Sequence, residues 1–204
     1  MIEIFDVEQG TPEWLAVRAG IPTASMFSAV MAYGKDGGDS KTRRAYMLRL
    51  IGERLTGEPA ETYSNRHTER GNAMEDEAAE AYAFESELTL EKVGFVRNGI
   101  RGCSPDRLIG ANGMCEIKTA LPHIQLERVL RGELPPEYKA QVQGQLLVAE
   151  REWCDFVSYW PRLPVLQVRV YRDGPYIEKM DAAIRKFVDE MEAFQAQIVS
   201  RMNK

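Results

Sequence analysis

Two acidic residues and a lysine near the middle of the chain have the spacing of a hydrolytic metal site. Asp106 follows Ser104-Pro105, and nine residues separate it from Glu116-Ile117-Lys118. On a strand, Glu116 and Lys118 share one face because side chains alternate with a period of two. Carboxylates bind hard divalent cations, and a neighbouring lysine can position or deprotonate an attacking water. The pattern therefore predicts metal-assisted hydrolysis of a phosphodiester.

The turn between the two halves of this segment decides whether Asp106 joins the group. A two-residue loop would put Asp106 on the opposite face of the hairpin. A three-residue loop at 111–113, with Gly113 left-handed, would bring Asp106 opposite Lys118 and make Glu116 its diagonal neighbour, about 7–8 Å away. We therefore predict the three-residue loop. The alternative is that Asp106 caps a turn and that Glu116 and Lys118 form an ordinary solvated strand face.

The elements that must position these residues follow from capping residues and apolar spacing. Their order predicts an α/β or α+β fold in which a central mixed sheet is flanked by helices, with one domain over residues 1–204. The predicted helices are 12–20, one starting at 23, 41–55, 72–86, 122–131, 138–149 and 176–202. The predicted strands are 94–96, the hairpin within 102–119, 153–159 and 165–171.

Three of these segments have further features. The apolar stripe predicted for helix 41–55 is Leu48, Ile51 and Leu55, and basic residues occupy much of the remaining surface. Segment 33–40 is rich in Gly and Asp, which predicts a mobile loop that is able to touch a ligand. The apolar residues of helix 176–202 have a nearly heptad spacing, which suits either an oligomer contact or an intramolecular core.

Composition limits the class of protein. The 204 residues carry a net charge of -5, and 44% of them are hydrophobic, which excludes a disordered or fibrous chain. The acidic N-terminus does not resemble a signal peptide, and the apolar runs are too short to span a membrane, so we expect a cytoplasmic protein. Three cysteines and two histidines show no metal-ligand spacing, so oxygen atoms would hold any metal. We predict that Cys103 and Cys115 are packing residues.

The negative charge is concentrated in one segment. Residues 69–91 contain eight acids and one base, so this segment carries -7 and the rest of the chain +2. We expect the helix 41–55, together with Arg97, Arg101 and Arg107, to supply positive surface for phosphates. Binding to DNA is therefore compatible with the overall charge, although sequence-independent binding to duplex interiors should be weak.

Four short segments occur in order between about Gln9 and Trp160, and together they carry a family resemblance. The segments are Arg18-Ala19-Gly20-Ile21-Pro22-Thr23-Ala24-Ser25, Gly102-Cys103-Ser104-Pro105-Asp106, Glu116-Ile117-Lys118 and Tyr138-Lys139-Ala140-Gln141-Val142-Gln143. In this order they resemble the λ-exonuclease or YqaJ-like family of phage recombination nucleases, which belongs to the PD-(D/E)XK superfamily. The resemblance implies a restriction-endonuclease-like core.

The resemblance also implies roles for individual residues. The catalytic residues it implies are Glu75, Asp106, Glu116, Lys118 and Gln141, with Tyr138 as a possible accessory residue. The Mg²⁺ ligands it implies are Glu75, Asp106, Glu116 and the carbonyl of Ile117, with Mn²⁺ as a substitute. The residues it implies for a terminal 5′-phosphate are Arg18, Ser25 and Ser104. The family commonly has a glycine-like residue after the Asp, whereas this chain has Arg107, which would contact DNA or point outward.

Reasoning from the residues alone leaves competing explanations for these positions. Glu75 would also suit a capping box with Asn72, and Gln141 and Gln145 would also suit an ordinary polar helix face. Ser104 would also simply precede a proline turn. Independent physics supports Arg18 as a phosphate ligand, since a guanidinium can fork onto phosphate oxygens.

The activity implied is a Mg²⁺-dependent exonuclease that digests duplex DNA from 5′ ends, preferably phosphorylated, and leaves 3′ single-stranded tails. The family relation also implies a homotrimer and a single-strand annealing recombinase as a partner. One alternative is an endonuclease of restriction or repair type that uses the same residues. A second is a nucleic-acid-binding scaffold without catalysis.

Overall fold

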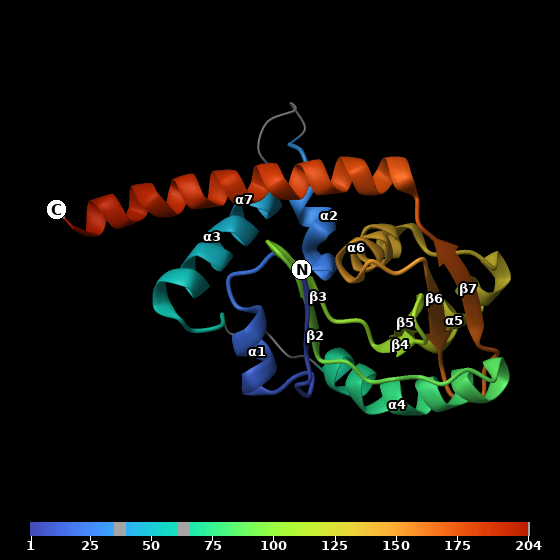
Figure 1. Cartoon of the computed structure of the whole chain (residues 1–204). Helices are drawn as coiled ribbons and strands as arrows, with labels where there is room; N and C mark the ends of the chain where they lie inside the picture. Colours follow the sequence, from blue (N-terminus) through green and yellow to red (C-terminus); the bar gives the residue numbers. More distant parts are fainter. Residues whose placement is uncertain (35–39, 61–65, 204) are drawn as a thin grey trace.

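The computed structural model describes residues 1–34, 40–60 and 66–203 and contains two β-sheets (Figure 1). Most of the loop predicted at 33–40 lies outside the described residues. One sheet has the strand order β1-β2-β3, and the other has the order β4-β5-β6-β7. The strands are β1 (Ile2–Phe5), β2 (Phe95–Asn98), β3 (Arg101–Cys103), β4 (Arg107–Ile109), β5 (Gly113–Thr119), β6 (Trp153–Tyr159) and β7 (Leu166–Tyr171).

The four-stranded sheet is mixed, as the sequence predicted. β4 and β5 form an antiparallel hairpin, β5 and β6 are parallel, and β6 and β7 are antiparallel. The connection from β5 to β6 contains two helices, because parallel neighbours need a long crossover. The three-stranded sheet is antiparallel throughout, and its strand β1 was not predicted. A four-residue strand has too short an alternation to be distinguished from an irregular N-terminus.

Helices cover both faces of the mixed sheet (Figure 1). α4 packs against β5 on one face, while α6 lies on the other and also contacts β2 and β3. The helices are α1 (Pro12–Arg18), α2 (Phe27–Val30), α3 (Lys41–Thr56), α4 (Arg66–Ser86), α5 (Pro122–Arg131), α6 (Lys139–Ala149) and α7 (Gly174–Met202), with 3₁₀ turns η1 (Ala24–Met26) and η2 (Pro136–Tyr138). None of the helices in the described part of the chain is both long and apolar enough to cross a membrane.

Alternation along the strands divides the buried apolar residues between two cores. Met114 and Phe156 face α6 and belong to the larger core, whereas Ile117 and Val157 face α4 and belong to the smaller one. A sheet covered on both faces has strands that are apolar throughout, which makes Glu116 at 0% exposure an exception. All three cysteines are free and buried, as predicted for the two that were interpreted as packing residues.

Most predicted helices occur where the sequence indicated, and α1 has the expected cap at Thr11. The stripe predicted for α3 was right at Ile51, which is buried, and wrong at Leu48 and Leu55, which are exposed. Tyr46 and Leu50 are buried in their place. Arg43 is also buried on this helix, with its guanidinium 5.1 Å from the centre of the Phe187 ring. The spacing of the apolar residues gave no sign that an arginine of this helix would be buried.

The start predicted for α4 was also wrong. The helix begins at Arg66, six residues before the expected start, so Asn72 lies inside it. The capping-box explanation of Glu75 is thereby excluded, since a cap residue must precede the helix.

The long helix α7 packs inside its own chain. It contacts α2, α3 and α6, and it runs along one side of the molecule past the end of α3 (Figure 1). The nearly heptad stripe is buried from Ile177 to Met191 and only partly buried at Phe194 and Ile198. The apolar stripe was predicted to form either an oligomer contact or an intramolecular core, and the structure shows the intramolecular core.

Candidate active site

One cavity of about 320 Å³ lies between the N-terminal segment, the β4–β5 hairpin and α6. It gathers both groups of residues that the sequence singled out, although they come from five separate parts of the chain. Nine predicted site residues line it: Arg18, Ser25, Glu75, Ser104, Asp106, Glu116, Ile117, Lys118 and Gln141.

The β4–β5 hairpin brings Asp106 to Glu116 by a register that differs from the predicted one. Ile109 pairs with Gly113, so the loop has the predicted three residues but occupies 110–112. Gly110 takes the left-handed conformation, with φ of 52°, in place of Gly113. A Cβ on Gly113 would come within 2.2 Å of the Trp153 ring, which explains why a glycine is needed there.

The shift moves the pairing by two residues, an even number that keeps every side chain on its predicted face. Arg107 pairs with Cys115, so the next residue along, Asp106, lies opposite Glu116 and not opposite Lys118. The Oδ2 atom of Asp106 accepts a hydrogen bond of 2.6 Å from the backbone N–H of Ile117. The two carboxylates are therefore held on one face of the hairpin.

Glu116 is buried, and three side-chain donors contact its carboxylate. The amide of Gln141 donates to Oε1 and that of Gln145 to Oε2, each at 2.5 Å. The ammonium of Lys118 lies 2.5 Å from Oε1. Gln141 and Gln145 share one side of α6 because they are four residues apart. They are therefore part of the site, and the explanation as an ordinary polar face is wrong.

Burial and mutual charge govern the ionisation of this group. Burial, together with the negative charge of Glu116, holds the pKa of Asp106 well above its ordinary value. Burial alone would lower the pKa of Lys118, but the charges of Glu116 and Asp106 outweigh it and raise that pKa overall. Lys118 is thus a cation paired with the Glu116 carboxylate.

The donor set is suited to a hard divalent cation. Glu75, Asp106, Glu116 and the backbone of Ile117 offer oxygen ligands around one cavity. Burial, and after it the negative charge of Glu116, raises the pKa of Asp106, and a cation between the two carboxylates would offset the second of these causes. Among the described residues, no three acidic, histidine or cysteine side chains already stand at ligand distances from a common point. An ion would have to share the carboxylates with the protein donors that now hold them.

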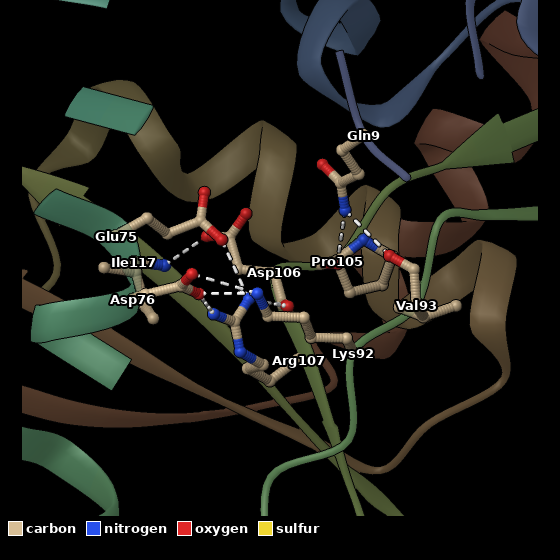
Figure 2. A network of polar contacts seen from close by, with 9 residues as sticks. All are labelled: Gln9, Glu75, Asp76, Lys92, Val93, Pro105, Asp106, Arg107 and Ile117. Carbon is tan, nitrogen blue, oxygen red and sulfur yellow. Dashed lines mark hydrogen bonds and ion pairs between the residues drawn. The ribbon is translucent and has the colours of Figure 1, made fainter. Parts of the chain in front are cut away.

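Arg107 does not point outward, so that prediction was wrong, and its guanidinium lies against Glu75 and Asp76 (Figure 2). Its contact with DNA stays a prediction. Arg107 is 5% exposed and faces α4, since the side chain after Asp106 points to the other side of β4. Its Nη1 donates to Glu75 Oε1 at 2.8 Å and to the Asp106 carbonyl at 2.5 Å. Its Nη2 donates to Asp76 Oδ1 at 2.6 Å.

The residues predicted to bind phosphate, Arg18, Ser25 and Ser104, also line the cavity and are called the phosphate wall below. Trp14 connects two of them. The guanidinium of Arg18 lies 4.0 Å from the centre of the Trp14 ring. The indole N–H donates to Ser104 Oγ at 2.9 Å and to the Gly94 carbonyl at 3.0 Å. Ser25 is exposed at the mouth, in the short 3₁₀ turn that precedes α2.

Tyr138 does not line the cavity but lies beside it. Lys118 Nζ is 5.7 Å from its ring centre, and its hydroxyl accepts a 2.9 Å hydrogen bond from Arg128. Arg128 is itself held by Ser158, so a buried polar chain fixes the ring. This places Tyr138 as a neighbour of Lys118, consistent with an accessory position.

Three residues that shape the site were not predicted to belong to it. Gln9 donates to the carbonyls of Val93 and Pro105 and so fixes the turn before Asp106 (Figure 2). Trp14 precedes Arg18 by four residues on a helix, a spacing that does signal contact. Gln145 was noticed only as part of a helix face.

Some of the positive surface predicted for phosphates is used inside the protein. Arg107 is buried against Glu75 and Asp76, and Arg101 forms an ion pair with Asp181. Arg54 donates to the Gly20 carbonyl at 2.8 Å. These arginines are therefore structural, and the prediction of a basic patch that includes them was wrong.

Comparison with known proteins relates the sequence and the fold of this chain to a recombinase family and to a solved exonuclease. The sequence profile of the YqaJ-like viral recombinase domain matches residues 13–152. The crystal structure of an alkaline exonuclease, LHK-Exo from Laribacter hongkongensis, has a TM-score of 0.85 and 33% identity, covering 95% of this chain and 98% of that chain. Its complex with dAMP gives a TM-score of 0.85 and 34% identity over the same shares of the two chains.

A more distant structure agrees in fold. The phage-related exonuclease from Haemophilus somnus 129PT has a TM-score of 0.65 and 16% identity, covering 89% of this chain and 96% of that chain. A search of curated proteins gave no significant match. The mixed α/β architecture described above is thus that of the alkaline exonuclease.

Proposed function

Since the chain belongs to the YqaJ-like viral recombinase domain family, we propose that it is a Mg²⁺-dependent exonuclease that acts on the ends of double-stranded DNA. It digests one strand from the 5′ end, releases 5′-mononucleotides and leaves a 3′ single-stranded tail. The similarity to LHK-Exo supports exonuclease activity, and the resemblance to the λ-exonuclease family supplies the polarity.

The observation that carries the proposal is the meeting of two functional groups in one cavity. Asp106, Glu116 and Lys118 line this cavity, and Arg18 and Ser104 line it as well. The first group suits cleavage of a phosphodiester, and the second suits the binding of a terminal phosphate. A cavity of about 320 Å³ is in the size range of small-molecule sites, and LHK-Exo was solved with a mononucleotide, dAMP.

The residues would divide the chemistry as follows. Glu75, Asp106, Glu116 and the Ile117 carbonyl would hold one or two Mg²⁺ ions. When bound, Mg²⁺ supplies the positive charge that polarises the scissile phosphate and makes a water nucleophilic at neutral pH. As a cation, Lys118 would orient that water by donating a hydrogen bond to it. Gln141 keeps Glu116 in place through its 2.5 Å hydrogen bond.

The phosphate wall would set the end preference. Arg18 forks onto the oxygens of the terminal 5′-phosphate, and Ser25 and Ser104 donate hydroxyl hydrogen bonds to it. The Trp14 ring holds the Arg18 guanidinium from one side, so the donor geometry exists before DNA binds. Holding each new 5′-phosphate keeps the register between successive cleavages.

Assembly and partners extend the proposal. The family resemblance implies a homotrimer that encloses DNA, and enclosure suits a chain whose net charge of -5 makes binding by overall charge weak. We also expect a single-strand annealing recombinase to receive the 3′ tail, and a cytoplasmic setting. Light scattering tests the assembly: a trimer has three times the 23.1 kDa mass of the chain, and a monomer would contradict it.

The test of the activity compares linear and covalently closed circular duplexes in Mg²⁺ and in EDTA. An exonuclease digests the linear duplex in Mg²⁺ and spares the circle. Cutting of the circle would establish the endonuclease alternative with the same residues. Asp106→Ala should abolish digestion, whereas Arg131→Ala, at an exposed helix position, should leave it unchanged.

The scaffold alternative predicts a different result in the same experiment. DNA would be bound without release of nucleotides, and Asp106→Ala would change nothing. Release of nucleotides that depends on both Mg²⁺ and Asp106 excludes it.

A further inference from the structure

We propose that Arg107 is a positioning residue of the metal site, which holds the Glu75 carboxylate at the edge of the cavity and ties α4 to the backbone of Asp106. This inference rests on the proposed function, because it assigns Arg107 an effect on metal binding through Glu75. The family resemblance does not supply it, since a glycine-like residue commonly stands at this position.

The geometry shows one guanidinium joining two elements that both supply proposed ligands (Figure 2). Arg107 donates to the carbonyl of its chain neighbour Asp106, and on the α4 face of the sheet it donates to Glu75 and Asp76. Its side chain is only 6% exposed. An arginine can make these contacts together because its planar head carries five N–H donors, whereas a lysine ammonium is a compact point charge.

Glu75 needs such support more than the other proposed ligands do. Glu116 is held by α6 and Lys118, and Asp106 is held by the Ile117 N–H, but Glu75 comes from a helix on the other face of the sheet and is 32% exposed. Ordering a glutamate side chain costs conformational entropy. An ion pair formed before the metal arrives removes part of that cost from metal binding.

The Glu75 carboxylate can contact Arg107 and a metal ion at the same time. Arg107 contacts Glu75 through Oε1, and a carboxylate has a second oxygen with lone pairs of its own. Residues that hydrogen-bond to a metal-ligating side chain commonly orient it, and their loss reduces metal affinity or activity by about 10- to 100-fold. Glu75 thus resembles a ligand presented to the cavity by the residue behind it.

The positive charge of Arg107 does not oppose a cation, because Asp76 balances it. Asp76 Oδ1 accepts from Arg107 at 2.6 Å, and its carboxylate also pairs with Lys92. Asp76 is 64% exposed, so its contact with Lys92 is a solvent-screened pair that contributes little. Asp76 therefore neutralises and anchors the guanidinium, and Lys92 offers a matched control outside the site.

The test measures Mn²⁺ binding to the full chain by isothermal titration calorimetry without DNA. Arg107→Ala should weaken Mn²⁺ binding by about 10- to 100-fold. In a Glu75→Ala background, the same change should alter the dissociation constant by less than about twofold, because the residue it acts through is gone. Lys92→Ala should bind Mn²⁺ as the wild type does. Arg107→Lys should recover only part of the affinity.

Two results would overturn the inference while the proposed function stands: Arg107→Ala binding Mn²⁺ as tightly as the wild type, or equal losses in the presence and absence of Glu75. Equal losses would mean that Arg107 only supports the fold. If Arg107→Ala does not fold, Arg107→Gln keeps an amide donor and is tested in the same cycle. A wild-type chain that binds no Mn²⁺ would refute the proposed function and this inference together.

Discussion

Lys118→Met separates the contribution of the lysine to stability from its contribution to catalysis. Lys118 is the only positively charged side chain contacting Glu116 among the described residues, and the side chain of Glu116 is 0% exposed. Methionine keeps much of the apolar stem and removes the charge. Nuclease activity should be lost, and the metal-free protein should become less stable because the buried Glu116 carboxylate loses the ammonium that contacts it.

The size of the destabilisation follows from what remains around Glu116. Breaking a buried ion pair by removing one partner costs about 3–5 kcal/mol. Here Gln141 and Gln145 still donate to the carboxylate, and the Lys118 side chain is 29% exposed. The loss is then closer to one hydrogen bond to a charged group, about 2 kcal/mol. For a chain of this length, that lowers the melting temperature by about 4–8 °C.

Thermal unfolding in EDTA and in Mg²⁺ measures this effect. The deficit should be present in EDTA and smaller in Mg²⁺, because a bound cation replaces the lost charge in the folded state. Lys139→Met is the matched control, since its pair with Asp173 is exposed on both sides and should cost less than about 1 kcal/mol. Equal stability of Lys118→Met and the wild type in EDTA would refute the charge-compensation reasoning.

Further predictions concern the phosphate wall and the thiols. Arg18→Ala should reduce the preference for 5′-phosphorylated over 5′-hydroxyl ends by about 10-fold or more, the value of a hydrogen bond to a charged group. An unchanged ratio of the two initial rates would count against that role. Trp14→Phe keeps a ring beneath Arg18 but loses the bond to Ser104, so it should retain part of the preference; complete loss would argue against stacking as the support. Burial raises the pKa of all three cysteine thiols, so the folded protein should react with a thiol reagent far more slowly than the unfolded protein. Rapid labelling under native conditions would show that a thiol is accessible.

The hairpin shows how far sequence reasoning reaches. Strand alternation and the need for a turn predicted that Asp106, Glu116 and Lys118 share a face, and they do. The register within that face was wrong by two residues, because the choice between Gly110 and Gly113 as the left-handed residue depends on Trp153, which lies 40 residues further along the chain. The local sequence therefore predicts which face of the strand a side chain takes more reliably than it predicts which residues pair across the hairpin.

Ion pairs between residues far apart in the chain could not be predicted from the sequence. Nothing near Arg107 or Arg43 in the chain indicates that the first is buried against Glu75 and the second against Glu190. An arginine has a strong average preference for the surface, and only a partner from a distant element reverses it. Arg43 is accordingly among the buried residues of α3, which an apolar stripe alone does not predict.

The central claim is that the cavity around Asp106 digests DNA from the 5′ end in the presence of Mg²⁺. The most direct measurement follows linear, 5′-phosphorylated duplexes labelled at either the 5′ or the 3′ end, incubated with wild-type protein and with Asp106→Asn. The account predicts that the wild type releases the 5′ label first, as a mononucleotide, and that Asp106→Asn and EDTA both prevent release. Early release of the 3′ label, or digestion that persists in Asp106→Asn, would contradict it.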